Sequence, residues 1–282
     1  MSSPSHGTTW NRLLVKIGQH SILIGLAVVV LMPILIIVAT SFMTPQQSLT
    51  GDIIPDPLSV ESYPQVFERI PFVRYILNTV FIAFTAATAT VLSSIPAAYA
   101  LSILRFRGRN ALFLVVVAAM MLPAQVTIIP LYVMWANTGL IGSPLPLIIP
   151  FIFMDGFSIF LLRQFFISIP LSYIESARLD GASEVNIIIR IFLPMVKSAL
   201  MAVFLFAFFF HWNDYFSPLL YLSSNTEWYT LSLALASFRS SYNVDWTMTM
   251  AATSLFMLPV IVIFALAQRT FVQGISLSGI KG

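Results

Sequence analysis

Few residues in this sequence have a type and spacing that could do chemistry. The chain has no cysteine and only three scattered histidines, so neither a thiolate site nor a histidine-built metal site is expected. Gly274 and Gly279 have the glycine spacing of a phosphate-binding loop, but Ile280 stands where that loop needs lysine. No two carboxylates pair inside an apolar segment. We therefore expect a protein that is not an enzyme and has no cofactor of its own.

The composition is that of an integral membrane protein. Of 282 residues, 58% are hydrophobic and 9% are charged, against about 25% charged in an ordinary soluble domain. This excludes a disordered chain and argues against a soluble fold. The net charge of +3 comes from basic residues that lie between apolar segments, so no nucleic-acid partner is expected.

Apolar segments long enough to cross a bilayer predict an all-α fold with six transmembrane helices. Segment 21–43 is too long for a signal peptide, so we expect it to be retained. With the N-terminus inside, 11 of the 14 basic residues are cytoplasmic, which predicts that both termini are cytoplasmic. Residues 1–20 would be a cytoplasmic segment and 21–282 a single transmembrane domain. The predicted spans lie near 21–43, 75–104, 111–136, 144–165, 194–216 and 246–268.

Two of these spans have unusual residues. The second is rich in alanine and serine between Ala83 and Ala98, and small residues let helices approach closely. We expect it to pack inside the bundle or against a partner. In the third, Pro123 and Pro130 are expected to break the helix.

The loop at 170–193 carries most of the information. Ser172 with Glu175 forms a capping-box pattern, so a short helix is predicted to begin there. Gly181 would end that helix, and Asp180 or Ser183 would cap a second one. In the second helix, apolar residues recur with α-helical spacing and predict one apolar face. That face consists of Val185, Ile188, Ile189 and Phe192.

An apolar face outside the spans suggests either a protein partner or an interfacial helix on the lipid headgroups, and the residues by themselves leave these open.

Four sequence patterns resemble one family. Residues 175–182, Glu-Ser-Ala-Arg-Leu-Asp-Gly-Ala, with Ile-Phe-Leu-Pro beginning nine residues after Ala182, resemble the EAA motif of membrane subunits of binding-protein-dependent ABC importers. Residues 97–100, 212–218 and the tail 268–282 are similar to the carbohydrate-uptake (MalG-like) branch of that family. Ser176 stands where the family usually has alanine.

The resemblance implies a mechanism in which this loop is the coupling helix, seated in a cleft of a separate ATPase subunit. Gly181 would provide the turn, and Val185 to Phe192 would fill the hydrophobic part of the cleft. The docking residues would be Glu175, Ser176, Ala177, Asp180, Gly181, Ala182, Val185, Ile188, Ile189 and Phe192.

The resemblance also implies partners. These are an ATPase dimer that binds ATP and Mg, a second homologous permease, an extracytoplasmic solute-binding protein and membrane lipid. The external loop 222–245 would reach the binding protein. The tail 269–282, with Gly274, Gly279 and Lys281, would insert between the ATPase subunits. The implied location is the cytoplasmic membrane of a bacterium or archaeon, and the implied solute a sugar, a polyol or a glycerol-phosphate ester.

Several polar residues in or near the spans could contact such a solute. Asp155 is the foremost, because an intramembrane carboxylate is costly and is by default a functional candidate. For each of the others, helix–helix hydrogen bonding or interface anchoring is the favoured explanation. They are Asn78, Gln125, Asn137, Trp212, Asn213 and Asp214.

One other class of transporter stays open at this point. An ion-coupled secondary transporter would act without an ATPase, but it would need internal repeats and usually several intramembrane carboxylates. Asp155 is the only clear one here.

Overall fold

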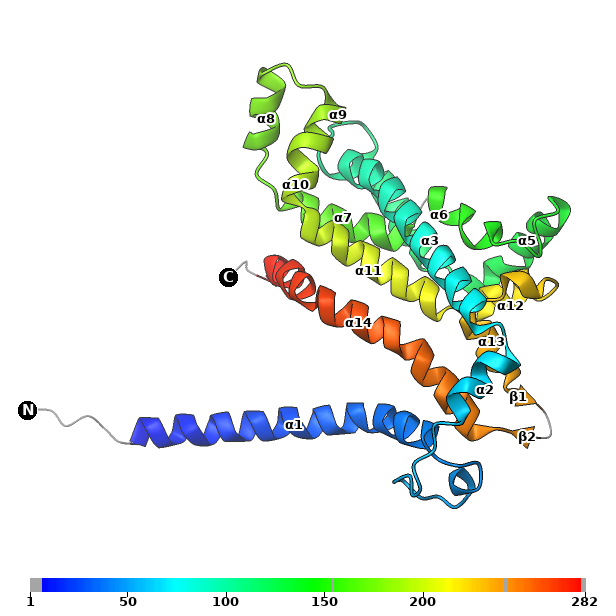
Figure 1. Ribbon diagram of the computed structural model, residues 1–282. Coiled ribbons are helices and arrows are strands. Elements are labelled where there is room, and N and C mark those ends of the chain that lie inside the picture. The colour runs from blue at the N-terminus through cyan, green and yellow to red at the C-terminus, as the bar shows by residue number, and fades with distance from the viewer. Residues whose placement is uncertain (1–6, 154, 241–242, 280–282) are drawn as a thin grey trace, which may run out of the picture. The chain divides into compact units, whose positions relative to one another are not determined.

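The computed structural model describes the backbone of residues 7–153, 155–240 and 243–279 (Figure 1). Side chains are described for 13–123, 126–153, 155–236, 238 and 245–268. The fold is helical, as predicted. Within the described ranges the one β-ladder is short, with β1 (Arg239–Ser240) antiparallel to β2 (Asn243–Val244).

The chain divides into two compact units, and each is described by itself. The first contains residues up to Ile70 together with Phe238–Leu255. In it, the side chains of α1 (Gly7–Ser41) are exposed along most of the helix. At its end the Ser41 hydroxyl lies 2.8 Å from the hydroxyl of Tyr63 in α2 (Ser62–Arg69). This unit also contains η1 (Gln47–Leu49), the β-ladder and the start of α14 (Trp246–Gly279).

The second unit contains Pro71–Ser237 and the residues from Phe256 onward. Its elements, in chain order, are α3 (Phe72–Ser102), α4 (Arg109–Met120), α5 (Ala124–Asn137), η2 (Leu145–Leu147), α6 (Ile149–Phe153), α7 (Gly156–Ile167), α8 (Ser172–Leu179), α9 (Glu184–Asn186), the π-helix η3 (Ile187–Phe192), α10 (Leu193–Met195), α11 (Lys197–Asn213), α12 (Phe216–Leu222), η4 (Thr226–Trp228), α13 (Leu231–Ser237) and the rest of α14.

Four helical segments of the described chain are long and apolar enough to cross a membrane. A fifth candidate is the pair Glu184–Met195 and Lys197–Asn213, which is bent by 82°. The predicted count of six spans therefore stays a prediction. The four segments are Leu13–Ser41, Phe72–Ser102, Ile149–Ile167 and Trp246–Gln268.

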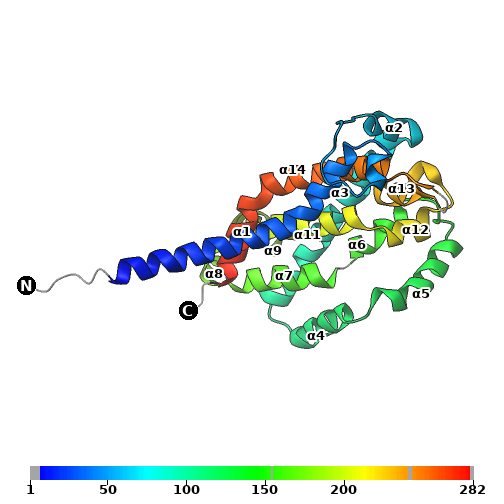
Figure 2. The same cartoon turned by 90° about the horizontal axis from the view of Figure 1, so that it is seen from below.

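Two predicted spans are interrupted. The segment 111–136 is not one helix: α4 ends at Met120 and α5 begins at Ala124, because Pro123 adopts an extended backbone (Figure 2). The break predicted at Pro123 is confirmed, but the one at Pro130 is wrong, since that proline lies inside α5. The segment 144–165 is also divided, into η2, α6 and α7.

The alanine-rich helix α3 is the centre of the second unit. Ala83, Ala86, Ala87 and Ala98 are fully buried, and α3 runs beside α7 and α11. Trp212 and Phe208 of α11 pack against Ala83 and Ala87. The small side chains permit this close approach, so the prediction that this helix packs inside the bundle is confirmed.

Candidate functional site

The first helix of the loop at 170–193 begins where the sequence predicts, but without the expected cap. Helix α8 spans Ser172–Leu179, and Leu171 precedes it with no side-chain capping bond. Ser172 is the first helical residue, so the capping box predicted for Ser172 and Glu175 does not form. Glu175 instead donates its backbone N–H to the Leu171 carbonyl at 2.9 Å.

Gly181 makes the turn between the two helices. Its φ of +80° is the left-handed conformation that glycine adopts without strain. The Ala182 N–H bonds the Ala177 carbonyl, and the Gly181 N–H bonds the Arg178 carbonyl, which is a Schellman motif. Ser183 then caps the second helix by accepting the Asn186 N–H. Of the two caps that the sequence allowed, Ser183 is therefore the one used.

The second helix departs from the predicted register. After one turn of α9 the backbone becomes a π-helix over Ile187–Phe192. The wider turn buries Ile187 and Phe192 completely, while Val185 and Ile189 are 63% and 57% exposed. The prediction that Val185, Ile188, Ile189 and Phe192 share one face is therefore wrong, since it assumed α-helical spacing throughout.

The inner face of the loop is anchored to the long helices. Phe192 is wedged between Tyr99 of α3 and Phe166 of α7, with ring centroids 5.2 and 4.6 Å away and both contacts edge-to-face. Ile174, Ala177 and Ile187 belong to the same buried cluster. Ala177 and Phe192 are therefore buried within this chain and are not available to a partner.

A polar contact adds to this anchor. Glu184 accepts hydrogen bonds from Arg178 Nε at 2.8 Å and from the Tyr99 hydroxyl at 2.7 Å. The hydrogen bond from Arg178, and after it the one from Tyr99, holds the pKa of Glu184 below its ordinary value. The same bond raises the pKa of Arg178. Glu184 thus ties the loop to α3 while its carboxylate stays ionised.

The outer face of the loop is exposed in this chain and presents large apolar side chains among polar ones. Leu179 is 89% exposed, and Tyr173, Val185 and Ile189 are also exposed. Glu175 and Asp180 lie on the exposed surface as well. Sequence analysis missed Tyr173 and Leu179. Leu179 could have been found, because it directly precedes the Asp180–Gly181 turn and has no place on the face formed by Ile174 and Ala177.

A cavity of about 380 Å³ lies between α3, α7 and α11. Asp155 lines it and caps α7 by accepting the Ser158 N–H at 2.8 Å. Thr90 also lines it; its hydroxyl is buried and has no hydrogen-bond partner among the described residues. His211 and several phenylalanine rings complete the wall. The cavity therefore combines aromatic surface with polar groups that have spare hydrogen-bonding capacity.

A second cavity of about 200 Å³ shares part of this wall. Phe151, Phe210 and His211 line both spaces. The His211 ring packs edge-to-face on Phe151 at 4.3 Å and on Phe210 at 5.3 Å. Asp214, whose carboxylate accepts the Ser217 N–H of α12 at 3.1 Å, lines the second cavity. Two of the predicted solute-contact residues, Asp155 and Asp214, thus line two cavities that share one aromatic cluster.

The other predicted solute-contact residues whose side chains are described do not line these two cavities. The Asn78 amide donates to the carbonyls of Glu227 and Tyr229, at 2.8 and 3.0 Å, and so holds η4 beside α3. Trp212 is fully buried against Phe256, and Asn213 donates to a carbonyl in its own helix. Asn137 is exposed at the end of α5. The side chain of Gln125 lies outside the described residues.

The comparisons with known proteins decide the family. Residues 89–277, more than half of the chain, match the family described as "Binding-protein-dependent transport system inner membrane component". The chain belongs to this family. The match includes the whole loop at 170–193, so the resemblance drawn from the EAA-like residues is confirmed.

Individual relatives agree. The permease is 30% identical to the inner membrane ABC transporter permease protein YcjP of Escherichia coli (strain K12), over 97% of this chain and 99% of that protein. It is 32% identical to the arabinooligosaccharides transport system permease protein AraQ of Bacillus subtilis (strain 168), with 83% of each chain covered.

A solved structure is also similar. It belongs to a bacterial ABC transporter involved in the import of the acidic polysaccharide alginate, with a TM-score of 0.81 and 25% identity, over 95% of this chain and 99% of that chain. The permease is therefore a membrane translocation subunit of an ABC importer, and these relatives give no support to the ion-coupled alternative.

Two remaining predictions concern cofactors and the tail. In the described part of the permease, no three His, Asp or Glu side chains gather as a metal site would require. The backbone of α14 continues through Gly274 to Gly279, so that part of the tail is helical. Lys281 lies outside the described residues.

Proposed function

We propose that this permease, with a second homologous membrane subunit, forms the alternating-access pathway for a sugar or a related polar solute. ATP hydrolysis on a separate ATPase dimer would drive the cycle, and an extracytoplasmic binding protein would deliver the solute. The observation that carries this proposal is the two-sided loop at 172–193, anchored inside by Phe192 and exposed outside at Leu179. Support for a sugar comes from the substrates named for AraQ and for the alginate importer.

In this proposal the outer face of the loop docks on the ATPase. The exposed apolar side chains of Tyr173, Leu179, Val185 and Ile189 would fill the hydrophobic part of the cleft, with Glu175 beside them. A protein partner would remove this apolar surface from water, which is the main source of favourable free energy in such contacts. Phe192 has a different role from the one the sequence suggested: it transmits motion inward.

Transmission follows from the packing. Phe192 contacts α3 and α7, and the buried cluster continues to Val196, Ala199 and Val203 at the start of α11. A closely packed interior is poorly compressible, so a displacement of the loop moves the attached helices with it. Closure of the ATPase dimer would thereby tilt α3, α7 and α11 and switch the side from which the pathway is open.

The two cavities are the proposed solute path through this subunit. Asp155 can accept hydrogen bonds from sugar hydroxyl groups, and Thr90 can donate or accept one. The phenylalanine rings offer flat apolar surface for the CH faces of a sugar. Phe151, Phe210 and His211 would separate the two spaces. Asp214 would meet the solute in the second space.

The topology that this function needs has six spans with both termini in the cytoplasm of a bacterium or archaeon. Its support is the distribution of basic residues. In this topology residues 222–245 face the binding protein and residues 269–282 reach the ATPase dimer. The cytoplasmic side would hold Arg12, Lys16, Arg105, Arg107, Arg109, Arg163, Arg178, Arg190, Lys197, Arg269 and Lys281, leaving Arg69, Arg74 and Arg239 outside.

Cross-linking tests the docking directly. The sequence has no cysteine, so a Leu179→Cys variant carries a single thiol on the outer face. With the ATPase subunit present, a thiol-to-lysine cross-linker should join the two chains, and added ATP should change the yield. Leu145→Cys is the matched control, since Leu145 is exposed but belongs to η2, outside the loop. Equal yields at 145 and 179, or none at 179, would contradict the proposal.

The solute is tested separately. Transport into proteoliposomes should be measured with the binding protein and three labelled solutes: an oligosaccharide, a polyol and a glycerol-phosphate ester. Uptake of the oligosaccharide that requires ATP is the expected result. Uptake driven by an ion gradient without ATP would favour a secondary transporter instead.

A further inference from the structure

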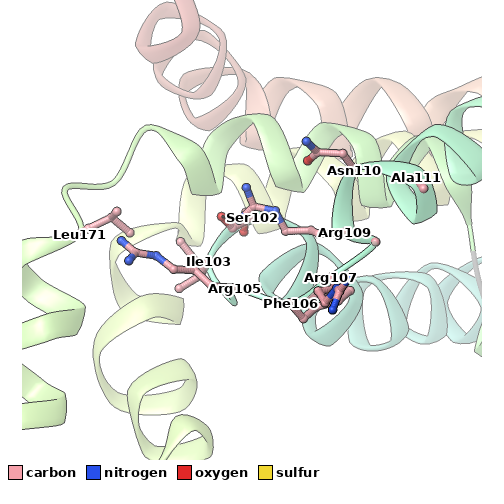
Figure 3. A pocket seen from close by; sticks show the side chains of 10 residues that line it. Ser102, Ile103, Arg105, Phe106, Arg107, Arg109, Asn110, Ala111 and Leu171 are labelled. Carbon is pink, nitrogen blue, oxygen red and sulfur yellow. Dashed lines mark hydrogen bonds between the residues drawn. The ribbon is translucent and has the colours of Figure 1, made fainter.

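A hollow of about 820 Å³ lies where α3 connects to α4, and the solute path does not involve it (Figure 3). This volume is within the range of about 300–1,000 Å³ that is usual for small-molecule sites. Three arginines from the 103–109 connection line the hollow: Arg105, Arg107 and Arg109. Its lining includes no acidic residue. The hollow is therefore strongly cationic.

Among the described residues, none of these arginines forms a salt bridge with a carboxylate. Arg109 is half-buried and donates to the carbonyls of Ser102 and Leu104, at 3.3 and 3.2 Å, so it straps the turn together. Arg105 and Arg107 are exposed, and neither forms an ion pair in the part of the chain that the structure describes. A cluster of guanidinium groups without carboxylates is a binding site for anions, and the planar guanidinium matches the oxygen geometry of a phosphate.

Apolar surface lies directly beside these charges. Phe106 is 41% exposed at the same turn, and Leu171 forms another part of the wall. On α4, which leads away from the hollow, Leu112 and Val115 are exposed as well. Cationic groups next to an outward apolar helix face match a molecule that has an anionic head and acyl chains. A free phosphate would use only the arginines.

We propose that this hollow binds the phosphate group of an anionic phospholipid from the cytoplasmic leaflet. Arg105 and Arg107 hold the headgroup, and Phe106 with the exposed face of α4 contacts the acyl chains. This proposal depends on the proposed function only in assuming that the hollow lies on the cytoplasmic side of the membrane. In this arrangement the lipid is a structural ligand of the permease and takes no part in the solute path.

Because the hollow lies beside the start of α8, a bound lipid would affect the loop at 170–193. Figure 3 shows the Arg105 side chain reaching toward Leu171, the residue that precedes α8, while Arg109 turns back toward Ser102. Arg105 also lines a smaller cavity of about 180 Å³ with Ile174 and Glu175 of α8. A bound headgroup would thus fix Arg105 beside the start of the coupling helix, and anionic lipid should raise transport-coupled ATP hydrolysis.

The test measures binding first. The chain, with whatever subunits co-purify, is taken in detergent and titrated with dioctanoyl phosphatidylglycerol, dioctanoyl phosphatidylcholine and inorganic phosphate, and bound molecules are counted by native mass spectrometry. Phosphatidylglycerol should bind most tightly, and added salt should weaken it. Each arginine near an anionic lipid contributes about a 5-fold change in affinity, so R105Q/R107Q should bind it about 25-fold more weakly.

Controls separate the alternatives. Lys197→Gln removes an exposed cation outside the hollow and should leave lipid binding unchanged. The double variant keeps Arg109, which straps the turn, so the fold should survive. Inorganic phosphate binding as tightly as phosphatidylglycerol would overturn the lipid assignment, and unchanged lipid binding by R105Q/R107Q would overturn the site.

Loss of the ATPase subunit from R105Q/R107Q with lipid binding intact would assign the arginines to a protein contact instead. Bound lipid is counted whether or not the ATPase subunit co-purifies. The lipid measurement therefore still tests this proposal if the docking proposal fails.

Discussion

The loop at 170–193, which we propose as the coupling loop, and the cavity beside Asp155 differ in how closely their side chains are packed and hydrogen-bonded. In the loop, Ile187 and Phe192 are packed on all sides, and Glu184 has two hydrogen-bond donors. In the cavity of about 380 Å³, whose lining includes Thr90, the buried Thr90 hydroxyl has no hydrogen-bond partner among the described residues. A segment that transmits force needs full contact with its neighbours, whereas a segment that receives a passing solute needs groups left free for it.

The largest expected effect is on stability, and it should differ between the inner and outer faces of the loop. Ile187→Ala removes a fully buried side chain and should lower the free energy of unfolding by about 2–5 kcal/mol. Ile189→Ala, two residues away and exposed, should leave the unfolding temperature unchanged and weaken ATPase co-purification. Thermal unfolding in detergent and a pull-down measure both. Equal destabilisation by the two variants would show that the π-helical register is wrong.

Two threonines of α3 sharpen the contrast between packed and free groups. The Thr79 hydroxyl donates to the Tyr75 carbonyl and accepts the Leu231 N–H, each at 2.8 Å. Thr79→Val should cost about 1–3 kcal/mol, because a buried N–H loses its partner. Thr90→Val should be nearly neutral for stability but should raise the KM for solute uptake. If Thr90→Val proved as destabilising as Thr79→Val, the cavity would be part of the packed interior.

A smaller effect is expected at the turn. A Cβ on Gly181 would meet nothing within 4 Å, so a substitution there strains only the backbone, at a cost of about 1–2 kcal/mol. The Gly181→Val variant should therefore insert into the membrane normally but lose solute uptake, because the turn changes. The Gly181→Asn variant should keep most of the uptake, because asparagine tolerates the left-handed conformation. Membrane abundance and uptake are measured together. Normal uptake by the valine variant would remove the turn from the mechanism.

The smallest effect concerns the ion pair of the loop. Arg178 and Glu184 are partly exposed, so Glu184→Gln should cost only about 0.2–1 kcal/mol at neutral pH. Because hydrogen bonds from Arg178 and Tyr99 lower the folded-state pKa of Glu184, this stabilisation is present above the unfolded pKa. It is lost as the pH falls through the lower, folded value. The unfolding temperatures of the original protein and the Glu184→Gln variant should therefore converge as the pH falls through this range. A difference that stays constant with pH would contradict a stabilising role for the Glu184 carboxylate.

Much of the coupling loop could be predicted from local rules. The start of α8 at Ser172, the left-handed turn at Gly181 and the cap at Ser183 each depend on a few neighbouring residues. The π-helix could not be predicted in this way. Its extra residue per turn is set by the fit of Phe192 between Tyr99 and Phe166, which lie far away in the sequence.

The solute-contact candidates show the same division. Asp155 stood out because a carboxylate in an apolar segment is costly, and the structure places it on a cavity wall. Asn78, by contrast, was singled out for its polarity, yet its amide holds two carbonyls of a distant segment. Thr90 could not be singled out from the sequence, because threonines are common in the chain and only the folded packing leaves its hydroxyl without a partner among the described residues.

By itself, the sequence determined the membrane class, the family and the place of the coupling loop, because hydropathy, charge and short motifs depend on residues close together in the chain. Tertiary structure alone decided which loop side chains are buried, how Phe151, Phe210 and His211 divide the cavities, and how three arginines line one hollow. The burial and the cavities depend on contacts between segments that lie far apart in the sequence, and no local pattern records them.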